Sequence, residues 1–315
     1  MTQQKKKDFK IAMLGMIPGN GHPYSWSAIV NGYDPEAMAS CPYPVIARYL
    51  GEQDLESVRI DGFQVSHIWT DDPAEAPEVA RAAKIPNVVE RPEDVIGEVD
   101  AVILATDDGT DHARRAAAFV EAGLPVFVDK PLATTVEDLR RFRRWRADGA
   151  RLLSSSGLRY GREIEALRGQ DWLWITGVTA KTWERYGIHV LEPVFTCFGP
   201  GFTEVRSERQ AGSDIVYLRH RSGAQATLAA IEKAFGSYAT FHAYGEEKQE
   251  AVRVLDTYAA FRGQLLAVTR WFREEIEPFP FAQTEEMMAV LIAALRSRDN
   301  GGTLESVDAV LEETL

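Results

Sequence analysis

Cysteine is nearly absent from this chain of 315 residues, which contains only Cys41 and Cys197. Two cysteines so far apart in sequence exclude a disulfide framework and a cysteine-based zinc site. Such sparse use of cysteine is typical of a reducing compartment. The sequence therefore predicts a cytoplasmic protein, and we expect no metal centre.

Long apolar runs and an excess of basic side chains are also lacking. No run is long enough to span a membrane, and the apolar segment near the N-terminus has no signal-peptide cleavage pattern. The chain has 35 Lys and Arg against 47 Asp and Glu, a net charge of −12. Nothing concentrates positive charge on a phosphate-tracking face, because the arginines of 140–146 fit the solvated face of a helix. We expect neither a membrane nor a nucleic-acid partner.

The first half of the chain alternates short apolar segments with helical patterns. Strands are expected at 9–16, 63–69, 88–89, 101–105, 126–128 and 151–156, and helices at 24–30, 77–84, 92–96 and 136–147. Strands that alternate with helices indicate a parallel, doubly wound sheet. Right-handed crossovers then place the carboxyl ends of all the strands at one edge.

The second half is richer in segments that alternate apolar and polar residues. These segments, 175–183, 203–210, 214–220, 225–232 and 240–244, predict a large and mostly antiparallel sheet, with helices at 162–167, 255–275 and 284–296. The expected fold class is therefore an α/β domain of residues 1–155 followed by an α+β domain of residues 156–315.

The segment from Asp100 to Leu132 is the most informative part of the chain. It reads as strand, helix and strand, and it ends in Asp129-Lys130-Pro131 with Lys130 at the carboxyl edge of the sheet. The pattern resembles the Gfo/Idh/MocA family of nicotinamide-dependent oxidoreductases, in which a strand ending in Thr-Pro, a later His and a Glu-Lys-Pro triplet mark a Rossmann cofactor domain. Thr106 and His112 stand at the first two of these positions. Gly187 and His189 match the Gly-x-His core of a helix in the family's second domain.

The resemblance implies that NAD or NADP binds across the first domain. Gly15, Gly19 and Gly21 follow the first strand but do not reproduce the usual G-x-G-x-x-G spacing, so a turn without a ligand stays an alternative. The candidate cofactor-binding residues are Gly15, Ile17, Pro18, Gly19, Asn20, Thr70, Asp71, Thr106, Asp107, His112, Asp129 and Lys130. Asp71 favours NAD if its side chain turns inward, and it caps the next helix otherwise.

The resemblance also implies that Lys130 and His189 are the catalytic pair. A lysine there orients the substrate hydroxyl, and burial is expected to lower its pKa toward the range that suits proton transfer. The alternatives are an exposed Lys130 paired with Asp129 and a core-facing His189 bonded to backbone. Family members often carry an acid four residues before the histidine, where this chain has Arg185. That arginine either binds a substrate carboxylate or marks a rewired or lost proton relay.

The implied activity is hydride transfer between nicotinamide and a secondary alcohol or ketone of a sugar, cyclitol or related polyol. The candidate substrate-binding residues are Arg159, Tyr160, Trp183, Arg185 and Tyr186. Two alternatives stay open. One is a relative that senses a ligand or cofactor without turnover, and the other is an enzyme that uses bound NAD for an elimination. We expect a homo-oligomer, a dimer or tetramer, formed through the C-terminal sheet.

Overall fold

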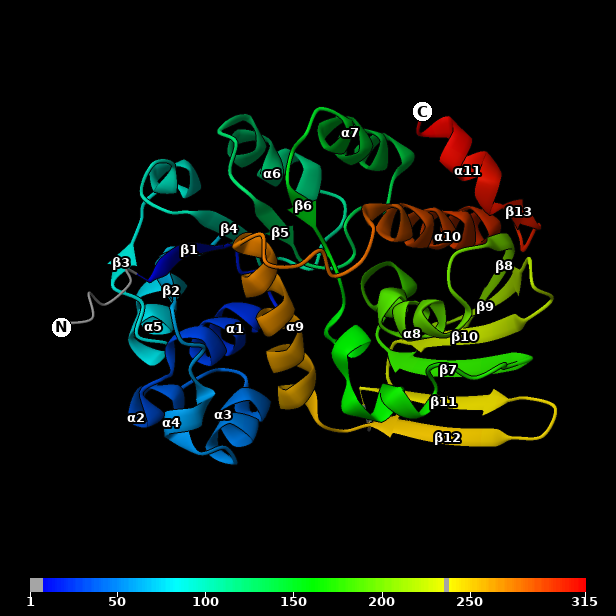
Figure 1. Ribbon diagram of the computed structural model, residues 1–315, viewed down its shortest axis with the longest axis horizontal. Coiled ribbons are helices and arrows are strands. Elements are labelled where there is room, and N and C mark those ends of the chain that lie inside the picture. Colours follow the sequence, from blue (N-terminus) through cyan, green and yellow to red (C-terminus); the bar gives the residue numbers. More distant parts are fainter. Residues whose placement is uncertain (1–7, 235–237) are drawn as a thin grey trace.

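The computed structural model describes residues 8–234 and 238–315, and it contains two sheets with helices around them (Figure 1). The first sheet has six parallel strands in the order β3-β2-β1-β4-β5-β6. Its strands are β1 (Phe9–Leu14), β2 (Phe63–Trp69), β3 (Asn87–Val88), β4 (Ala101–Leu104), β5 (Val126–Val128) and β6 (Leu152–Leu153). The predicted doubly wound sheet is confirmed. Its strand order reverses between β1 and β4, which is where such sheets bind ligands.

Helices cover both faces of this sheet, so its central strands read as continuous apolar runs. The helices of the first half are α1 (His22–Asn31), α2 (Pro35–Met38), α3 (Pro44–Gly51), α4 (Leu55–Val58), α5 (Glu75–Ala82), the 3-10 helix η1 (Pro92–Val95), α6 (His112–Glu121) and α7 (Val136–Ala147). The helix predicted at 136–147 is confirmed at both ends. Thr135 caps it by accepting a hydrogen bond from the Asp138 N–H.

Three short helices, α2 to α4, lie between α1 and β2 and were not predicted. They have four, eight and four residues, too few for an amphipathic period to be visible in the sequence. The insertion approaches the start of α1 closely. A Cβ atom on Gly21 would lie 2.7 Å from side-chain carbons of both Tyr43 and Ile46. Only glycine lets α3 pack at this distance, so the insertion forms a wall beside the end of β1.

The second sheet has seven strands in the order β12-β11-β7-β10-β9-β8-β13. They are β7 (Trp174–Ala180), β8 (Phe202–Gln210), β9 (Ser213–His220), β10 (Gln225–Ile231), β11 (Ala239–Tyr244), β12 (Gln249–Val254) and β13 (Glu305–Ser306). The predicted, mostly antiparallel sheet is confirmed, and only β7 and β10 pair in parallel. The strand expected to reach Trp183 ends at Ala180 instead. Trp183 begins the next helix, because Lys181 takes a left-handed conformation (φ 58°) that ends the strand.

The helices of the second half cover one face of this sheet and the junction between the two sheets (Figure 1). They are η2 (Gly157–Tyr160), η3 (Arg162–Ala166), α8 (Trp183–Phe198), α9 (Thr257–Phe272), α10 (Phe281–Asp299) and α11 (Val307–Glu313). In residues 8–234 and 238–315, no helix combines the length and apolar character that a membrane span needs.

Helix α9 joins the two halves of the molecule. It lies beside α1, between the two sheets (Figure 1), and Phe261, Leu265 and Trp271 are buried in the same core as β1. The first sheet ends with Leu153 and the second begins with Trp174, whereas the first core also includes a helix from the second half.

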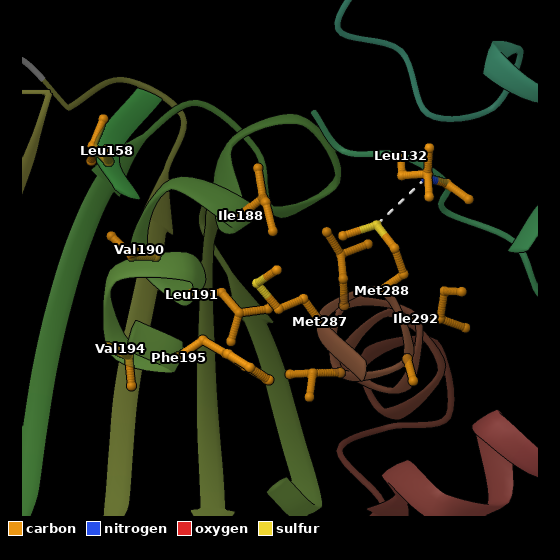
Figure 2. Close-up of a cluster of buried hydrophobic side chains, with 14 of the residues drawn as sticks. Leu132, Leu158, Ile188, Val190, Leu191, Val194, Phe195, Met287, Met288 and Ile292 are labelled. Carbon is orange, nitrogen blue, oxygen red and sulfur yellow. Dashed lines mark hydrogen bonds between the residues drawn. The ribbon is translucent and has the colours of Figure 1, made fainter. Parts of the chain in front are cut away.

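A second cluster of apolar side chains holds α8 and α10 against the corner that follows β5. Figure 2 shows Leu191 and Phe195 of α8 facing Met287 and Met288 of α10. The Met288 Sδ atom accepts a hydrogen bond from the Ala133 N–H at 3.4 Å. Because Ala133 lies three residues after Lys130, this packing fixes the corner that carries the candidate catalytic lysine.

Candidate active site

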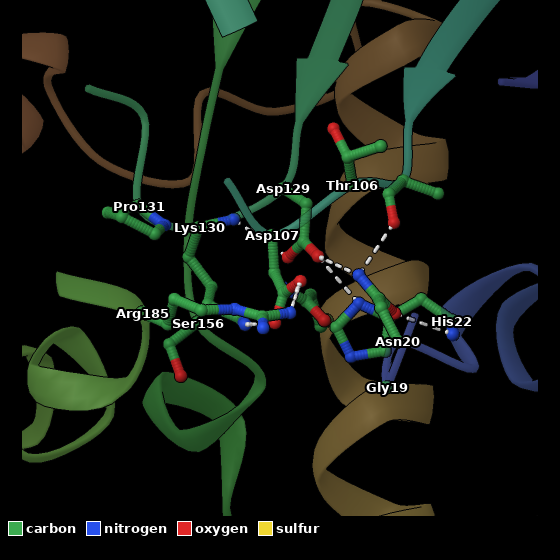
Figure 3. A network of polar contacts seen from close by, with 12 residues as sticks. Gly19, Asn20, His22, Thr106, Asp107, Asp129, Lys130, Pro131, Ser156 and Arg185 are labelled. Carbon is green, nitrogen blue, oxygen red and sulfur yellow. Dashed lines mark hydrogen bonds and ion pairs between the residues drawn. The ribbon is translucent and has the colours of Figure 1, made fainter. Parts of the chain in front are cut away.

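Lys130 lies at the carboxyl end of β5 and is buried, with 2% of its surface exposed. Its Nζ atom is 3.6 Å from the Asp107 Oδ2 atom, and it lies 5.0 Å from the centre of the Tyr186 ring. Figure 3 shows Asp107, Asp129 and Arg185 around this lysine. A buried ammonium group is costly unless it is paired, so these neighbours determine its charge state.

The predicted lowering of the Lys130 pKa is wrong. Burial alone would lower the pKa, but the carboxylates of Asp129 and Asp107 outweigh it and raise the pKa above its ordinary value. Lys130 therefore stays an ammonium group. It can donate hydrogen bonds to a substrate oxygen, but it has no lone pair with which to accept a proton.

Asp107 and Arg185 form an ion pair across the junction between the two domains. The Arg185 guanidinium donates to the Asp107 Oδ1 atom at 2.5 Å. Burial alone would raise the Asp107 pKa, but Lys130 and Arg185 lower it to about 2. Arg185, at the position where the family often carries an acid, thus pairs with an acid that follows β4. The two interpretations of Arg185, a substrate-carboxylate ligand and a rewired or lost relay, stay predictions.

His189 is fully buried on α8, and side chains occupy both of its ring nitrogens. Nδ1 is 2.7 Å from the Ser156 Oγ atom, and Nε2 is 2.8 Å from the Tyr238 hydroxyl. Burial, together with the nearby charge of Lys130, lowers the His189 pKa well below its ordinary value. His189 is therefore neutral, and Tyr238 lies between it and the adjoining cavity.

The turn after β1 brings the backbone very close to the end of β4. Gly15 has a φ of +90°, and a Cβ atom there would lie 2.7 Å from the Thr106 Cγ2 atom. Dinucleotide folds use their first glycine for such a tight turn. The predicted role of Gly15 therefore fits the backbone, although the G-x-G-x-x-G spacing is missing.

We expect Gly15→Ala to lower both stability and cofactor affinity. The left-handed backbone costs a non-glycine residue about 1–2 kcal/mol, and the overlap with Thr106 adds about 1–3 kcal/mol. Gly97→Ala is the matched control, because Gly97 has a φ of +87° and no atom within 4 Å of the added Cβ. Chemical denaturation and cofactor titration of both variants measure the difference. Equal losses in the two variants would contradict a special role for the Gly15 turn.

His112 connects the ends of β4 and β5. Its Nδ1 atom is 2.9 Å from the Pro131 carbonyl oxygen, and Nε2 is 2.9 Å from the Thr106 carbonyl oxygen. The ring is fully buried. His112 therefore shapes the wall under the site and does not contact the cavity.

Asn20 and His22 extend from the corner across the strand ends, as Figure 3 shows. Asn20 donates to the Ala105 carbonyl oxygen at 2.8 Å. The His22 Nδ1 atom is 2.6 Å from the Asp129 Oδ2 atom, and the ring stacks on Trp26 with 4.2 Å between centres. His22 was not among the predicted site residues. It belongs to no motif, and only the fold brings it to Asp129.

At the end of β2, Asp71 turns inward. Its Oδ2 atom accepts a hydrogen bond from the Met16 N–H at 3.0 Å, and its Oδ1 atom accepts one from Arg115 at 2.7 Å. The helix-capping alternative is not borne out, because Asp72 accepts only from the N–H of Ala74, which is itself the N-cap of α5 and has no side-chain cap. The Asp71 carboxylate, the candidate ribose acid, is therefore bonded to the backbone after β1 and paired with Arg115.

A cavity of about 360 Å³ adjoins these residues. It lies between the glycine corner, the α3 insertion, the start of α8 and α9. Its lining residues are Gly19, Asn20, Gly21, His22, Ser25, Tyr43, Val45, Ile46, Tyr49, Asp107, Lys181, Tyr186, Tyr238, Thr257 and Phe261. Of the predicted substrate-binding residues, Tyr186 is in this lining.

Three other predicted substrate residues lie in the packed region behind the cavity. The Arg159 Nε atom donates to the buried Glu192 at 2.5 Å, and the ring of Trp183, the first residue of α8, is 1% exposed. Tyr160 packs against Gly263 of α9. These side chains support the walls of the site and do not line the cavity. The periodicity of the sequence could not distinguish these two roles.

The residues at the switch point fit a nicotinamide dinucleotide. Gly19, Asn20 and Gly21 line the cavity at the amino end of α1, where peptide N–H groups and the helix dipole favour phosphate. Asp71 at the end of β2 would meet the adenosine ribose, and Thr106 and Lys130 at the ends of β4 and β5 would lie nearest the nicotinamide. These residues would hold the cofactor along the carboxyl edge of the sheet.

The first half of the chain matches a known family model. Residues 46–152 match a family model described as an oxidoreductase family with an NAD-binding Rossmann fold, the Gfo/Idh/MocA family. Inositol 2-dehydrogenase 3 of Saccharopolyspora erythraea is 51% identical over 49 residues, which are 15% of this chain and 14% of that protein. Inositol 2-dehydrogenase 1 of the same organism is 46% identical over 71 residues, 22% of this chain and 21% of that protein. The matched segments thus span only a small part of these relatives.

Solved structures show the same fold over nearly the whole chain. The scyllo-inositol dehydrogenase of Lactobacillus casei with bound NAD(H) and scyllo-inositol superposes with a TM-score of 0.73. The alignment covers 96% of this chain and 100% of that chain at 13% identity. The match to the Gfo/Idh/MocA family model is thus confined to residues 46–152, and the solved structures show that the fold extends over nearly the whole chain.

Proposed function

We propose that the protein is an NAD(P)-dependent dehydrogenase that acts on a secondary alcohol or ketone of a cyclitol, sugar or related polyol. The observation that carries this proposal is the buried Lys130 ammonium at the switch-point edge of the sheet, paired with Asp107 beside a cavity. The partial matches to inositol 2-dehydrogenases support the choice of a cyclitol-like substrate.

The bound nicotinamide supplies the hydride acceptor or donor, and the protein supplies orientation and charge. The Lys130 ammonium donates toward the substrate oxygen and stabilises the negative charge that develops there. Ser25 and Lys181 present further polar groups to hydroxyls, while the rings of Tyr43 and Tyr186 suit the apolar face of a cyclitol.

We infer that NAD is the preferred cofactor. The inward Asp71 carboxylate accepts hydrogen bonds from ribose hydroxyls and repels a 2′-phosphate. Arg115 partly offsets this repulsion, because it pairs with the same carboxylate at 2.7 Å. The ratio of the dissociation constants for NAD and NADP measures the preference.

Self-association through the second sheet, in the cytoplasm, is also part of the proposal. The face of this sheet turned away from its helices exposes several large apolar side chains, which is a common property of association surfaces. They are Val178, Ile215, Tyr217 and Tyr244, with 38% to 44% of their surfaces exposed. Sedimentation analysis of the purified protein measures the stoichiometry.

A substrate panel tests the proposed activity. Myo-inositol, scyllo-inositol and a set of neutral and acidic sugars are incubated with the protein and each oxidised cofactor, and reduced nicotinamide is followed by its absorbance. We expect turnover with at least one neutral cyclitol or sugar. If cofactor binds and no polyol is oxidised or formed, a ligand-sensing or non-redox function would replace the proposal.

A further inference from the structure

The groups already described leave the site without a proton acceptor. Lys130 is held as an ammonium group, and His189 has partners on both ring nitrogens. Oxidation of an alcohol releases the hydroxyl proton, which needs a base positioned within hydrogen-bond reach. The inference below rests on the proposed dehydrogenase function, because it asks which group of the same site takes that proton.

Most polar groups that line the cavity cannot serve as this base. Asp107 has a pKa of about 2 and is bound to Arg185, so it is a weak acceptor. The Lys181 ammonium has no lone pair to offer. The four tyrosines of the lining are phenols, which are protonated near neutral pH, and burial raises the pKa of Tyr238 further.

His22 differs from all of these groups. A carboxylate only accepts hydrogen bonds, so the 2.6 Å contact with Asp129 requires that His22 Nδ1 carries the hydrogen. That tautomer leaves the lone pair on Nε2. Within the described part of the chain, no hydrogen bond involves Nε2, and the ring lines the cavity with 13% of its side chain exposed.

The surroundings hold the His22 ring in one orientation. Trp26 stacks on one face at 4.2 Å, and Phe261 of α9 contacts it edge-on at 5.3 Å. Asp129 is itself fixed, because its Oδ1 atom accepts the Lys130 backbone N–H at 2.7 Å and the carboxylate is fully buried. The arrangement resembles an acid-histidine dyad, in which the buried acid fixes the tautomer and the orientation of the imidazole.

We propose that His22, oriented by Asp129, is the catalytic acid/base of this site, in place of the histidine on α8. In the oxidation direction, the substrate O–H bond breaks and its proton passes to His22 Nε2. The C–H bond breaks at the same carbon, its electron pair leaves as hydride to the oxidised nicotinamide dinucleotide, and the C=O bond forms. The imidazolium then releases its proton to water, and reduction follows the same path in reverse.

His22→Gln tests the role of the ring nitrogen while it keeps a polar side chain. We expect a loss of about 10²–10⁴-fold in kcat, with cofactor affinity unchanged as measured by quenching of tryptophan fluorescence. His242→Gln is the matched control, since His242 is exposed on β11 and makes no side-chain contact with the site.

In His22→Ala, added imidazole should restore turnover, because the vacated space lies against Trp26.

A second readout uses the cofactor-free wild-type protein and does not depend on turnover. Diethyl pyrocarbonate acylates accessible imidazole nitrogens, and we expect modification at His22 but not at the fully buried His112 and His189. His242 is the internal standard for an exposed histidine. Unmodified His22 beside modified His242 would overturn the inference, as would full turnover in His22→Gln or a loss confined to cofactor affinity. If the wild-type protein oxidises no polyol at all, the proposed function fails first.

Discussion

Replacing Lys130 with methionine is expected to lower turnover by about 10⁴-fold and to have a far smaller effect on cofactor binding. Methionine keeps most of the apolar stem and removes the ammonium group that faces the substrate oxygen. The loss should appear in kcat, because Lys130 stabilises charge that develops on that oxygen only as the reaction proceeds. Steady-state kinetics and fluorescence titration of the cofactor separate the two quantities.

Two further lysines serve as controls for this substitution. Lys181→Met removes a cation that lines the same cavity, 4.2 Å from the centre of the Tyr186 ring, and should cause a much smaller loss. Lys248→Met removes a cation near Trp172, outside the cavity, and should leave the kinetics unchanged. A Lys130→Met enzyme that retains its turnover would remove the lysine from its proposed role.

Replacing Asp107 with alanine is expected to destabilise the protein by about 3–5 kcal/mol, because it leaves the buried Lys130 without one of its counter-charges. Asp107 also holds Arg185 across the domain junction, so the same variant should lose activity. Chemical denaturation measures the free energy of unfolding. Asp72→Ala is the control, since Asp72 is exposed and its side chain contacts only the Ala74 N–H.

The same carboxylate predicts how stability depends on pH. The Asp107 pKa is about 2 in the folded protein and about 3.9 in an unfolded chain, so the folded state favours the ionised form. Its contribution, about 2 kcal/mol, is complete above pH 4 and is lost as the pH falls toward 2. The wild-type protein should therefore lose more stability over this range than Asp107→Ala does. Parallel pH profiles for the two proteins would contradict the assignment.

Moving the acid back to the position common in the family tests the ion pair directly. Asp107→Pro restores the Thr-Pro strand end, and Arg185→Asp restores the acid four residues before His189. The double variant should recover stability that Asp107→Pro alone loses, because a carboxylate again faces Lys130. If the loss of stability in the double variant equals the sum of the losses in the two single variants, the two positions are not coupled.

The order of elements could be predicted because the chain carries strong local patterns. The strand at 63–69 and the helix at 136–147 agree with the structure at both ends. The continuous apolar runs of β1 and β4 indicated a parallel sheet, and its strand order brings Lys130 to the predicted edge. By contrast, the α3 insertion has no visible period and depends on contacts with Gly21 that only the tertiary structure provides.

The charges of the site could not be predicted from single residues. Burial was expected to lower the Lys130 pKa, but the chain places Asp107 and Asp129 close enough to reverse the shift. In the sequence, Arg185 only departs from the acid that the family often has at this position. In the structure it pairs with Asp107, 78 positions earlier in the chain. His22 was missed for the same reason, because its partner Asp129 is 107 positions away.

Titration of the purified protein with NAD, NADH, NADP and NADPH, followed by tryptophan and nicotinamide fluorescence, tests the central claim most directly. A nicotinamide dinucleotide should bind between the glycine corner and Lys130. We expect saturable binding of at least one of the four forms, tighter for NAD(H) than for NADP(H), and weaker binding in Gly15→Ala than in Gly97→Ala. No binding of any of the four would contradict the claim that this site is a dehydrogenase site.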